Sequence, residues 1–368
     1  MSNTAPADAA PGEAPAPEAP VPDTPVRAVW SSQPPTAPWC PPEWLEHLHA
    51  VAPAFVAPGG AADASEELEV HDLVVSGERG SWLLASACRR GRLHAHRAEH
   101  REDAAAFGGA TRAGAAVWWA AVADGAGSAP YSRIGSALAV HAATRACESA
   151  LSAGAAGARA IGTDSNQTDA VLREAASAAQ RTLSDFAARA GLAKRDLRTT
   201  LLVALCTDTE IGVMHVGDGG TVLYGTDGSA TLPTAGHAGD FSGEVAHFLP
   251  DDGALEMLVA SVHVTPVRTS AGSTSSELTG VLLVTDGIED PWYPLTRTSV
   301  PLFTQLSHGI TDMNADASGV NQPMRGPVLT GDAPGVALGT WLGFEKRGEN
   351  DDRTIFAAVR RDVAWPSA

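Results

Sequence analysis

Short apolar runs that end in an aspartate next to a glycine recur from about residue 78 onward. "AAVWWAAVADG" ends at Asp124, "GVLLVTDG" ends at Asp286, and "HVGDGG" contains Asp218. Runs rich in Val, Leu and Trp that close on turn residues are typical of buried strands. A carboxylate at a strand end is exposed yet rigidly held, which suits a site for a hard cation bound through oxygen atoms.

Further acids stand in similar positions, in "REDA" at Glu102 and Asp103, in "VTDGIED" at Asp290, and in "GENDDRT" at Asp351 and Asp352. Taken singly, an Asp-Gly pair after a strand is more often a turn than a ligand. The order and spacing of the whole set favour ligands.

The composition excludes several classes of partner. The 368 residues are 44% hydrophobic and carry a formal net charge of -18, so nucleic acid and anionic membranes would be repelled. No apolar run is long enough to span a membrane, and the N-terminus does not have the pattern of a signal peptide. The four cysteines are far apart and form no C-x-x-C pair, which suits a reducing compartment. We expect a cytoplasmic monomer without nucleic-acid or membrane partners.

The chain divides into a tail and a body. Residues 1–41 form a Pro/Ala-rich acidic stretch that predicts disorder. Residues 42–77 are expected to be a linker or a docking segment. Trp30, Trp39 and Trp44 interrupt the polar composition, so the segment from about 28 to 56 either docks on the body or is a tether with exposed aromatic side chains. The body spans 78–362, with 291–348 as an insertion or flap.

The body alternates strand and helix patterns, which predicts an α+β fold. Apolar periodicity indicates helices at 132–152, with Ser132 as a cap, and at 169–190, with Asp169 as a cap. A further helix is expected near 299–308. Strands are predicted within 81–91, 115–125, 199–220, 221–226, 255–262, 280–287 and 353–361.

The order of the motifs resembles the PP2C-like family of metal-dependent serine/threonine protein phosphatases, in its bacterial branch. "RG", a spaced His and an acidic "DA" precede "ADGAGS", "SRIGS", "TTLL", "GDG", "TDGIE" and "DDRT". The resemblance covers about 78–360. It implies a four-layer α/β-β/α sandwich of two antiparallel sheets flanked by helices.

The resemblance also implies a set of metal ligands. Asp124 matches the aspartate that bridges two metals, and Gly125 the glycine that offers its carbonyl oxygen. Glu102 matches an acid that holds a metal-bound water. The other metal-binding aspartates correspond to Asp103, Asp286 and Asp351, and a third, weaker metal in some members corresponds to Asp218 and Asp290.

The activity implied is hydrolysis of phosphoserine and phosphothreonine in a phosphorylated protein substrate. The family uses two Mn²⁺ or Mg²⁺ ions, three in some members, and Asp124 and Asp286 would be central to catalysis. Two cations can activate a shared water for in-line attack and neutralise the phosphoryl oxygens.

Two features depart from the family pattern. Eukaryotic members have a histidine directly after the bridging Asp-Gly, where this chain has Ala126. His94 keeps a position seen in the bacterial branch and could bind phosphate or donate a proton, or could be an ordinary surface or core histidine. The phosphate-binding arginine is also displaced, and Arg97, Arg92 or Arg133 could replace it, although each could also be an ordinary surface arginine.

Two other functions stay open at this point. The missing histidine favours a pseudophosphatase that binds phosphoproteins with weak or no turnover, whereas the full set of aspartates disfavours it, because clustered carboxylates are costly without a cation. Hydrolysis of a small phosphorylated metabolite is the other alternative.

Overall fold

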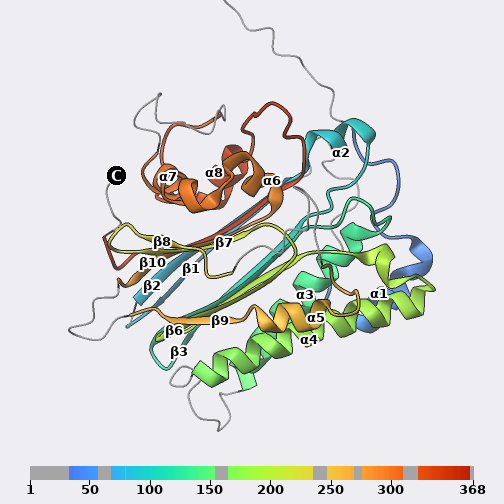
Figure 1. The fold of residues 1–368 in the computed structure, drawn as a ribbon, viewed down its shortest axis with the longest axis horizontal. Coiled ribbons are helices and arrows are strands. Elements are labelled where there is room, and N and C mark those ends of the chain that lie inside the picture. Colours follow the sequence, from blue (N-terminus) through green and yellow to red (C-terminus); the bar gives the residue numbers. More distant parts are fainter. Residues whose placement is uncertain are drawn as a thin grey trace, which may run out of the picture. The chain divides into compact units, whose positions relative to one another are not determined.

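Two antiparallel sheets form the centre of the fold (Figure 1). The computed structural model describes residues 33–56, 68–78, 80–153, 165–234, 247–268, 276–309 and 322–364. The six-stranded sheet has the order β1-β2-β11-β10-β7-β8, formed by Leu68–Gly77, Gly80–Arg89, Arg353–Arg360, Leu278–Val284, Gly220–Gly225 and Ala230–Thr231. The five-stranded sheet has the order β3-β4-β5-β6-β9, formed by Ala104–Arg112, Ala115–Ala123, Leu201–Cys206, Glu210–Val216 and His263–Pro266.

Alternation along the strands divides the apolar side chains between the two faces of each sheet. In β4, Trp118 is fully buried in the cluster between the two sheets, and Trp119 packs into the cluster beneath the helices. In β10, Leu283 faces the other sheet and Leu282 faces the helical layer. Each sheet is therefore buried on both faces, which explains why its central strands are almost continuously apolar.

Helices cover the two outer faces (Figure 1). The five-stranded sheet is covered by α3 (Ser132–Ala153), α4 (Ser165–Ala190), α5 (Ala254–Ala260) and α1 (Leu45–Val51). The six-stranded sheet is covered by α6 (Asp286–Glu289), α7 (Leu295–His308) and α8 (Pro334–Trp341). The short α2 (Arg92–Arg97) and the 3₁₀ helices Pro42–Trp44, Lys194–Leu197 and Asp290–Trp292 lie in the connections. The predicted four-layer sandwich is confirmed.

The strand register brings several loops to the same end of both sheets. Ala104 at the start of β3 pairs with Ala123 at the end of β4, so Asp103 and Asp124 extend from adjacent strands. In the other sheet, Val284 at the end of β10 pairs with Gly220 of β7 and Ile355 of β11. Neighbouring antiparallel strands begin and end at the same edge. The acids after β10, before β7 and before β11 consequently meet at that edge.

The local predictions were mostly accurate for the long helices. The helix predicted at 132–152 is α3, which contains Ser132 as its first residue. Helix α4 begins at Ser165, so Asp169 is not its cap and instead pairs with Arg173. The strand predicted at 255–262 is wrong, because 254–260 form α5 after Gly253 in a left-handed conformation. A short apolar run fits a buried helix as well as a strand.

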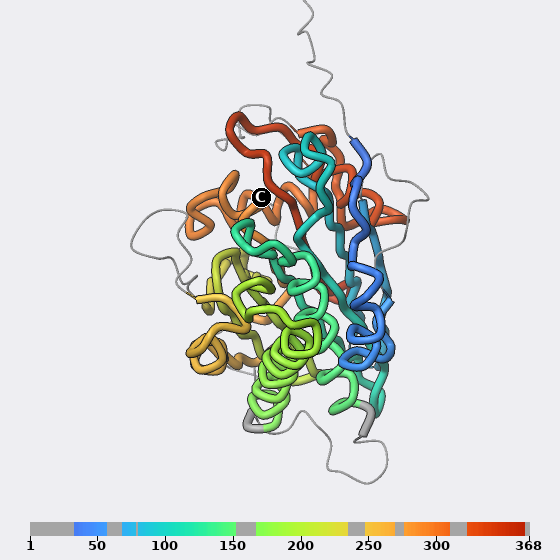
Figure 2. Tube along the Cα trace, turned by 90° about the vertical axis from the view of Figure 1, so that its right-hand side faces the viewer, coloured from blue at the N-terminus to red at the C-terminus, as the bar shows by residue number. Residues whose placement is uncertain are grey.

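The N-terminal segment, residues 33–56, packs on the body. Residues 1–32 of the expected tail lie outside the described residues, but Trp39 and Cys40 near its end are buried with Leu48 of α1 in the helical core. Backbone hydrogen bonds join Gln33 to Ala95 and Thr36 to Ala98. Figure 2 shows this segment in blue along one side of the fold. Residues 33–56 are therefore packed against the body.

Two other expected boundaries change. Strand β1, within the range assigned to the linker or docking segment, pairs along its whole length with β2 and belongs to the six-stranded sheet. The range 291–348 contributes α7 and α8 to the helical layer, where Leu302, Phe303 and Trp341 are buried. Residues 310–321 of that range lie outside the described part of the chain. The described part of 291–348 is thus a layer of the fold rather than a flap.

Replacement of Trp39 tests the packing of the N-terminal segment. Its ring lies 5.7 Å from that of Phe55, and its carbonyl oxygen accepts a hydrogen bond from Arg133. We expect Trp39→Ala to lower the free energy of unfolding by about 3 kcal/mol, because a large buried ring is lost. Val56→Ala, at a side chain that is 86% exposed, is the control and should change it by less than about 0.5 kcal/mol. Urea denaturation measures both, and equal small effects would contradict the packing described here.

Candidate metal centre

Carboxylates from several strand ends converge at the shared edge of the sheets. Oxygen atoms of Asp124, Asp218 and Asp286 lie within 4.8 Å of one another. The carboxyl groups of Asp103 and Asp124 are within hydrogen-bonding reach. Thr285, at the end of β10, donates a hydrogen bond of 2.9 Å to Asp103 Oδ2 and so joins the two sheets at this point. One acidic cluster thus forms from residues that are up to 183 positions apart in the chain.

Two oxygens of this cluster have no hydrogen-bond donor. Oδ1 of Asp103 and Oδ1 of Asp218 are buried and make no hydrogen bond in the described structure. A buried oxygen that has lost water and gained no donor is unfavourable. Oxygen atoms that converge in this way are the donors that Mg²⁺ and Mn²⁺ prefer. The residues present therefore fit divalent cations.

Burial and mutual repulsion raise the pKa values of these acids. Burial, followed by the charge of Asp352, raises the pKa of Asp103 to about 7. The pKa of Asp124 lies well above its usual value because of burial and then the charges of Asp286 and Asp103. Asp286 behaves in the same way, with burial first and Asp218 next. The cluster thus binds either protons or another source of positive charge.

The remaining predicted ligand, Asp351, lies beside this cluster. Its charge raises the pKa of Asp286, and its own pKa is raised by burial and by Asp352. A ligand atom of Asp351 also lies within 4.8 Å of His94 and Asp352. Gly91 is pressed against Asp351, since a Cβ atom on Gly91 would lie 2.3 Å from the Asp351 carbonyl carbon. Only glycine allows the two backbones to lie this close together. The contact between Gly91 and Asp351 therefore holds the loop that carries Asp351.

His94 is held by Asp352, the second acid of "GENDDRT", to which the sequence analysis assigned no specific role. Asp352 is 1% exposed and lies 3.0 Å from Nδ1 of His94. Its two oxygens also accept backbone hydrogen bonds of 2.6 Å from Gly91 and Glu102. Burial alone would lower the pKa of His94, but the hydrogen bond and charge of Asp352, with Glu102 and Asp351 nearby, raise it to about 9. His94 is therefore protonated at neutral pH.

Glu102 lies between His94 and the acidic cluster. Its carboxylate is 4.0 Å from Nε2 of His94. Burial raises the pKa of Glu102 to about 7, although a hydrogen bond from Ser132 and the charge of His94 each act to lower it. Its backbone carbonyl accepts a hydrogen bond from Ser136 of α3. Helix α3 and Asp352 thus hold the backbone of Glu102 from two sides.

A second group of acids surrounds Asp218. Burial raises the pKa of Asp218 to about 6, and the charge of Asp290 adds to this. Glu289, which the sequence analysis did not select, has a pKa raised to about 7 by burial and then by Asp218 and Asp290. Nε2 of the fully buried His215 lies 2.9 Å from the Asp218 carbonyl oxygen. His215 therefore fixes the turn that carries Asp218.

The other predicted residues have different surroundings. Gly125 is enclosed, since a Cβ atom there would lie 2.8 Å from Ser132. Arg97 is half exposed, and its guanidinium lies 3.9 Å from Glu99. Arg133 donates hydrogen bonds to the carbonyl oxygens of Trp39 and Pro130. None of these contacts of Arg97 and Arg133 is with a residue of the acidic cluster.

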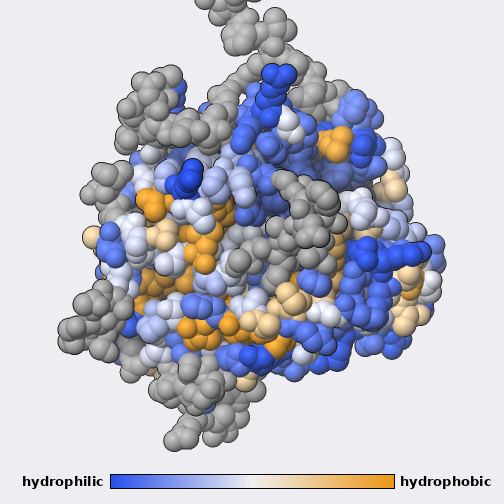
Figure 3. All heavy atoms as spheres, viewed as in Figure 1, coloured by the Kyte–Doolittle hydropathy of each residue, from blue (hydrophilic) through white to orange (hydrophobic). Residues whose placement is uncertain are grey.

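The surface near these loops is polar. Figure 3 shows that hydrophilic residues predominate on this face around the position of α2.

Within the described residues, no helix has both the length and the apolarity to cross a membrane. All four cysteines are free and buried.

The comparisons with known proteins identify the family. The sequence profile of protein phosphatase 2C matches residues 90–319. The chain belongs to the protein phosphatase 2C family. This family consists of metal-dependent protein serine/threonine phosphatases, which agrees with the class of enzyme and the kind of cofactor expected from the motifs. A search of curated proteins found no match.

Several solved structures are similar to this chain at low sequence identity. Serine-threonine phosphatase 2C from Toxoplasma gondii is 12% identical, with a TM-score of 0.50 over 80% of this chain and 99% of that chain. The catalytic domain of the phosphatase PstP, solved in complex with two manganese ions, is 18% identical with a TM-score of 0.41, covering 79% and 100% of the two chains. Stp1 from Staphylococcus aureus is 15% identical with a TM-score of 0.42, covering 79% and 94%.

The raised pKa values predict how stability depends on pH in this phosphatase. An acid whose pKa is higher in the folded than in the unfolded chain stabilises the fold when it is protonated, and this contribution is lost as the pH rises through the folded pKa. With chelator present, we expect the melting temperature to fall between about pH 5 and about pH 8, because Asp103 and Glu102 have pKa values of about 7. Added Mn²⁺ should reduce this fall. Differential scanning fluorimetry measures both effects, and a melting temperature that rises over this range in chelator would contradict the cluster described.

Proposed function

We propose that this chain hydrolyses phosphoserine and phosphothreonine in proteins with the help of two Mn²⁺ or Mg²⁺ ions. The observation that carries the proposal is the convergence of Asp103, Asp124, Asp218 and Asp286 with two buried oxygens that lack donors. Family membership supports the reaction class. The phosphoprotein substrate, the cytoplasmic location and the monomeric state stay predictions.

Each acid has a role that its position supports. We assign Asp124 as the bridging ligand, because it lies within reach of both Asp103 on one side and Asp286 on the other. Asp351 would complete the pair of sites, with the carbonyl oxygen of Gly125. Asp218 and Asp290 would hold a third, weaker cation, and Glu102 would hold a water. When bound, the cations would lower the pKa of water and neutralise the phosphoryl oxygens.

His94 is the proposed proton donor to the leaving alkoxide. It is 13% exposed, so substrate can reach it, and Asp352 holds Nδ1 and leaves Nε2 to face the cluster side near Glu102. Position 126 supplies no proton donor, because Ala126 stands there, is 6% exposed and donates only its backbone N–H to the carbonyl oxygen of Arg198. Proton donation matters most for a poor leaving group such as a serine or threonine alkoxide.

A pseudophosphatase remains the second candidate. Ala126, in place of the histidine of eukaryotic members, is the observation that favours it. The acidic cluster supports cation binding in either case, so only turnover separates the two candidates.

Turnover with and without metal tests the proposed function. We expect hydrolysis of p-nitrophenyl phosphate and of a phosphothreonine peptide that requires Mn²⁺ or Mg²⁺ and stops in chelator. Asp286→Asn should lower turnover at least about 1,000-fold, because one cation ligand is lost, with a melting temperature close to the native value. Asp185→Asn, at an exposed position on α4, is the control and should retain full activity. Cation binding without turnover on either substrate would favour the pseudophosphatase, and an active Asp286→Asn variant would remove the metal assignment.

The role of His94 is tested by the choice of leaving group. His94→Gln should reduce kcat for the phosphothreonine peptide by about 100-fold. The same variant should change kcat for p-nitrophenyl phosphate by less than about threefold, because nitrophenolate leaves without a proton. Steady-state kinetics on both substrates measure the difference. Equal losses on the two substrates would show that His94 has a structural or binding role instead.

A further inference from the structure

The helix that carries His94 is too short to be stable by itself. Helix α2 has 6 residues, whereas isolated helices shorter than about 12–15 residues are marginal in water. Its first turn is held by the loop before β11, because the N–H of Gly91 donates to Asp352 and the N–H of Leu93 donates to the carbonyl oxygen of Asn350. The carbonyl groups of its last turn need partners from outside the helix.

Residues 33–38, which we call the strap, supply these partners. The N–H of Gln33 donates a hydrogen bond of 3.0 Å to the carbonyl oxygen of Ala95, and the N–H of Thr36 donates one of 3.1 Å to that of Ala98. Ala98 ends α2 in the left-handed conformation, with φ of 56°. This conformation is uncommon for any residue other than glycine, so contacts with the surroundings must hold it. The strap provides one of these contacts.

Side chains on both sides of α2 bind the strap in return. The buried Arg90, before α2, donates hydrogen bonds of 2.8 Å to the carbonyl oxygen of Gln33 and of 2.9 Å to that of Glu99. After α2, Nε2 of His100 lies 2.8 Å from the carbonyl oxygen of Ala37. Polar contacts therefore join the strap to the segment before α2, to its last turn and to the segment after it.

The sequence of the strap, "QPPTAP", suits this task. Proline at 34, 35 and 38 fixes φ at those positions, so the strap loses less conformational entropy on packing than an ordinary segment would. Proline has no N–H, and backbone donors remain at Gln33, Thr36 and Ala37 alone. Two of these three donors bind α2.

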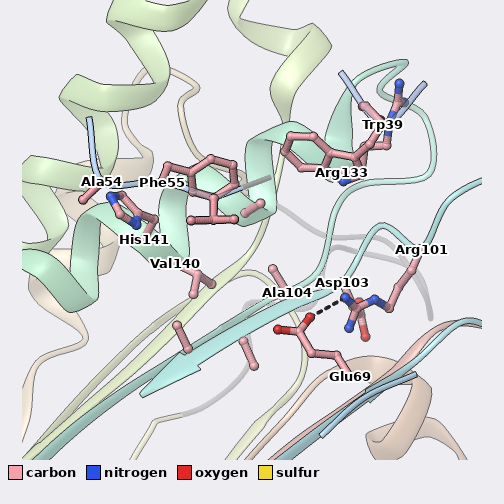
Figure 4. Close-up of a pocket in the computed structure, with 14 residues that line it drawn as sticks. Trp39, Ala54, Phe55, Glu69, Arg101, Asp103, Ala104, Arg133, Val140 and His141 are labelled. Carbon is pink, nitrogen blue, oxygen red and sulfur yellow. Dashed lines mark hydrogen bonds and ion pairs between the residues drawn. The ribbon is translucent and has the colours of Figure 1, made fainter. Parts of the chain in front are cut away.

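The strap is anchored to the core directly after Pro38. Trp39 is buried, and its carbonyl oxygen accepts a hydrogen bond of 2.7 Å from Nε of Arg133 on α3. Both residues line a cavity of about 260 Å³ beside Asp103, and Figure 4 shows them together at one end of it. The strap thus ties α2 to the helical layer that covers the five-stranded sheet.

We propose that the strap is a positioning element for His94. The inference rests on the proposed function, in which His94 donates a proton to the leaving alkoxide. Asp352 holds Nδ1 of His94, and the strap holds the last turn of the helix that carries it. A strap that detaches leaves this turn without partners, so the imidazole moves away from the acidic cluster. The proposed cation ligands lie outside both α2 and the strap, and cation binding would continue.

The strap lies outside the part of the chain that the family profile matches, which begins at position 90. The N-terminal segment of this chain therefore supplies support for a residue within that match. Movement of the strap would change proton donation and leave the metal centre intact.

Replacement of Thr36 by proline tests the positioning role, because it removes the N–H that binds Ala98. Thr36→Ala is the matched control, since it keeps this N–H and changes only an exposed side chain. We expect Thr36→Pro to lower kcat for the phosphothreonine peptide at least about tenfold and kcat for p-nitrophenyl phosphate less than about threefold, because nitrophenolate leaves without a proton. Thr36→Ala should match the native chain on both substrates. If Thr36→Pro does not fold, Gln33→Pro with Gln33→Ala makes the same comparison.

Hydrogen exchange measured by mass spectrometry tests the contact between the strap and α2 without turnover. In the full chain loaded with Mn²⁺, amides of residues 92–99 should exchange at least about tenfold faster in Thr36→Pro than in Thr36→Ala, because the last turn of α2 opens more often. Amides of β10, a core strand that the strap does not contact, should exchange equally in both variants.

The outcomes separate this proposal from the proposed function. Equal exchange of α2 in the two variants overturns the strap. Faster exchange with no loss of turnover, or with equal losses on the two substrates, in an active enzyme overturns the positioning role. A native chain without turnover removes the proposed function alone, and faster exchange of α2 in Thr36→Pro then still supports the hold of the strap on this helix.

Discussion

The cost of burying several carboxylates together is the constraint on which the site depends. Four aspartates are withdrawn wholly or partly from water at one edge of two facing sheets, and burial is the largest cause that raises the pKa of each, with charge repulsion from neighbouring acids next. Such a cluster is stable only with protons or cations to balance its charge. The fold supplies the rigidity that keeps the carboxylates together, because every one of them follows or precedes a buried strand. Without that framework the side chains would separate and regain water.

Hydrogen bonds from the backbone hold the loops around this cluster in place. Asp352 binds the backbones of Gly91 and Glu102 and the imidazole of His94, so a single buried carboxylate joins the turn after β2, the loop before β3 and the start of β11. Thr285 performs a similar task between β10 and Asp103. These contacts explain how loops from two separate sheets keep one geometry. They also place a charged histidine next to the acids, where proton donation is useful.

The N-terminal segment adds to the family fold instead of merely preceding it. Trp39 and Leu48 fill part of the core above α3 and α4, and Phe55 closes one side of a cavity whose other side is Asp103. The segment therefore contributes both to the core and to the lining of a cavity beside the metal centre.

The sequence by itself determined the family, the α+β sandwich and the acids of the cluster, because "ADGAGS", "TDGIE" and "DDRT" keep their order and each follows or precedes an apolar strand. Only the tertiary structure decided which acids meet, since the register of β3 with β4 and of β10 with β7 sets those distances. His215 and Glu289 lacked a clear signal for the same reason, and the role of Asp352, like theirs, comes from partners distant in the chain. Helix α5 and the packing of Trp39 were decided by burial against α4 and its neighbours, which local periodicity does not report.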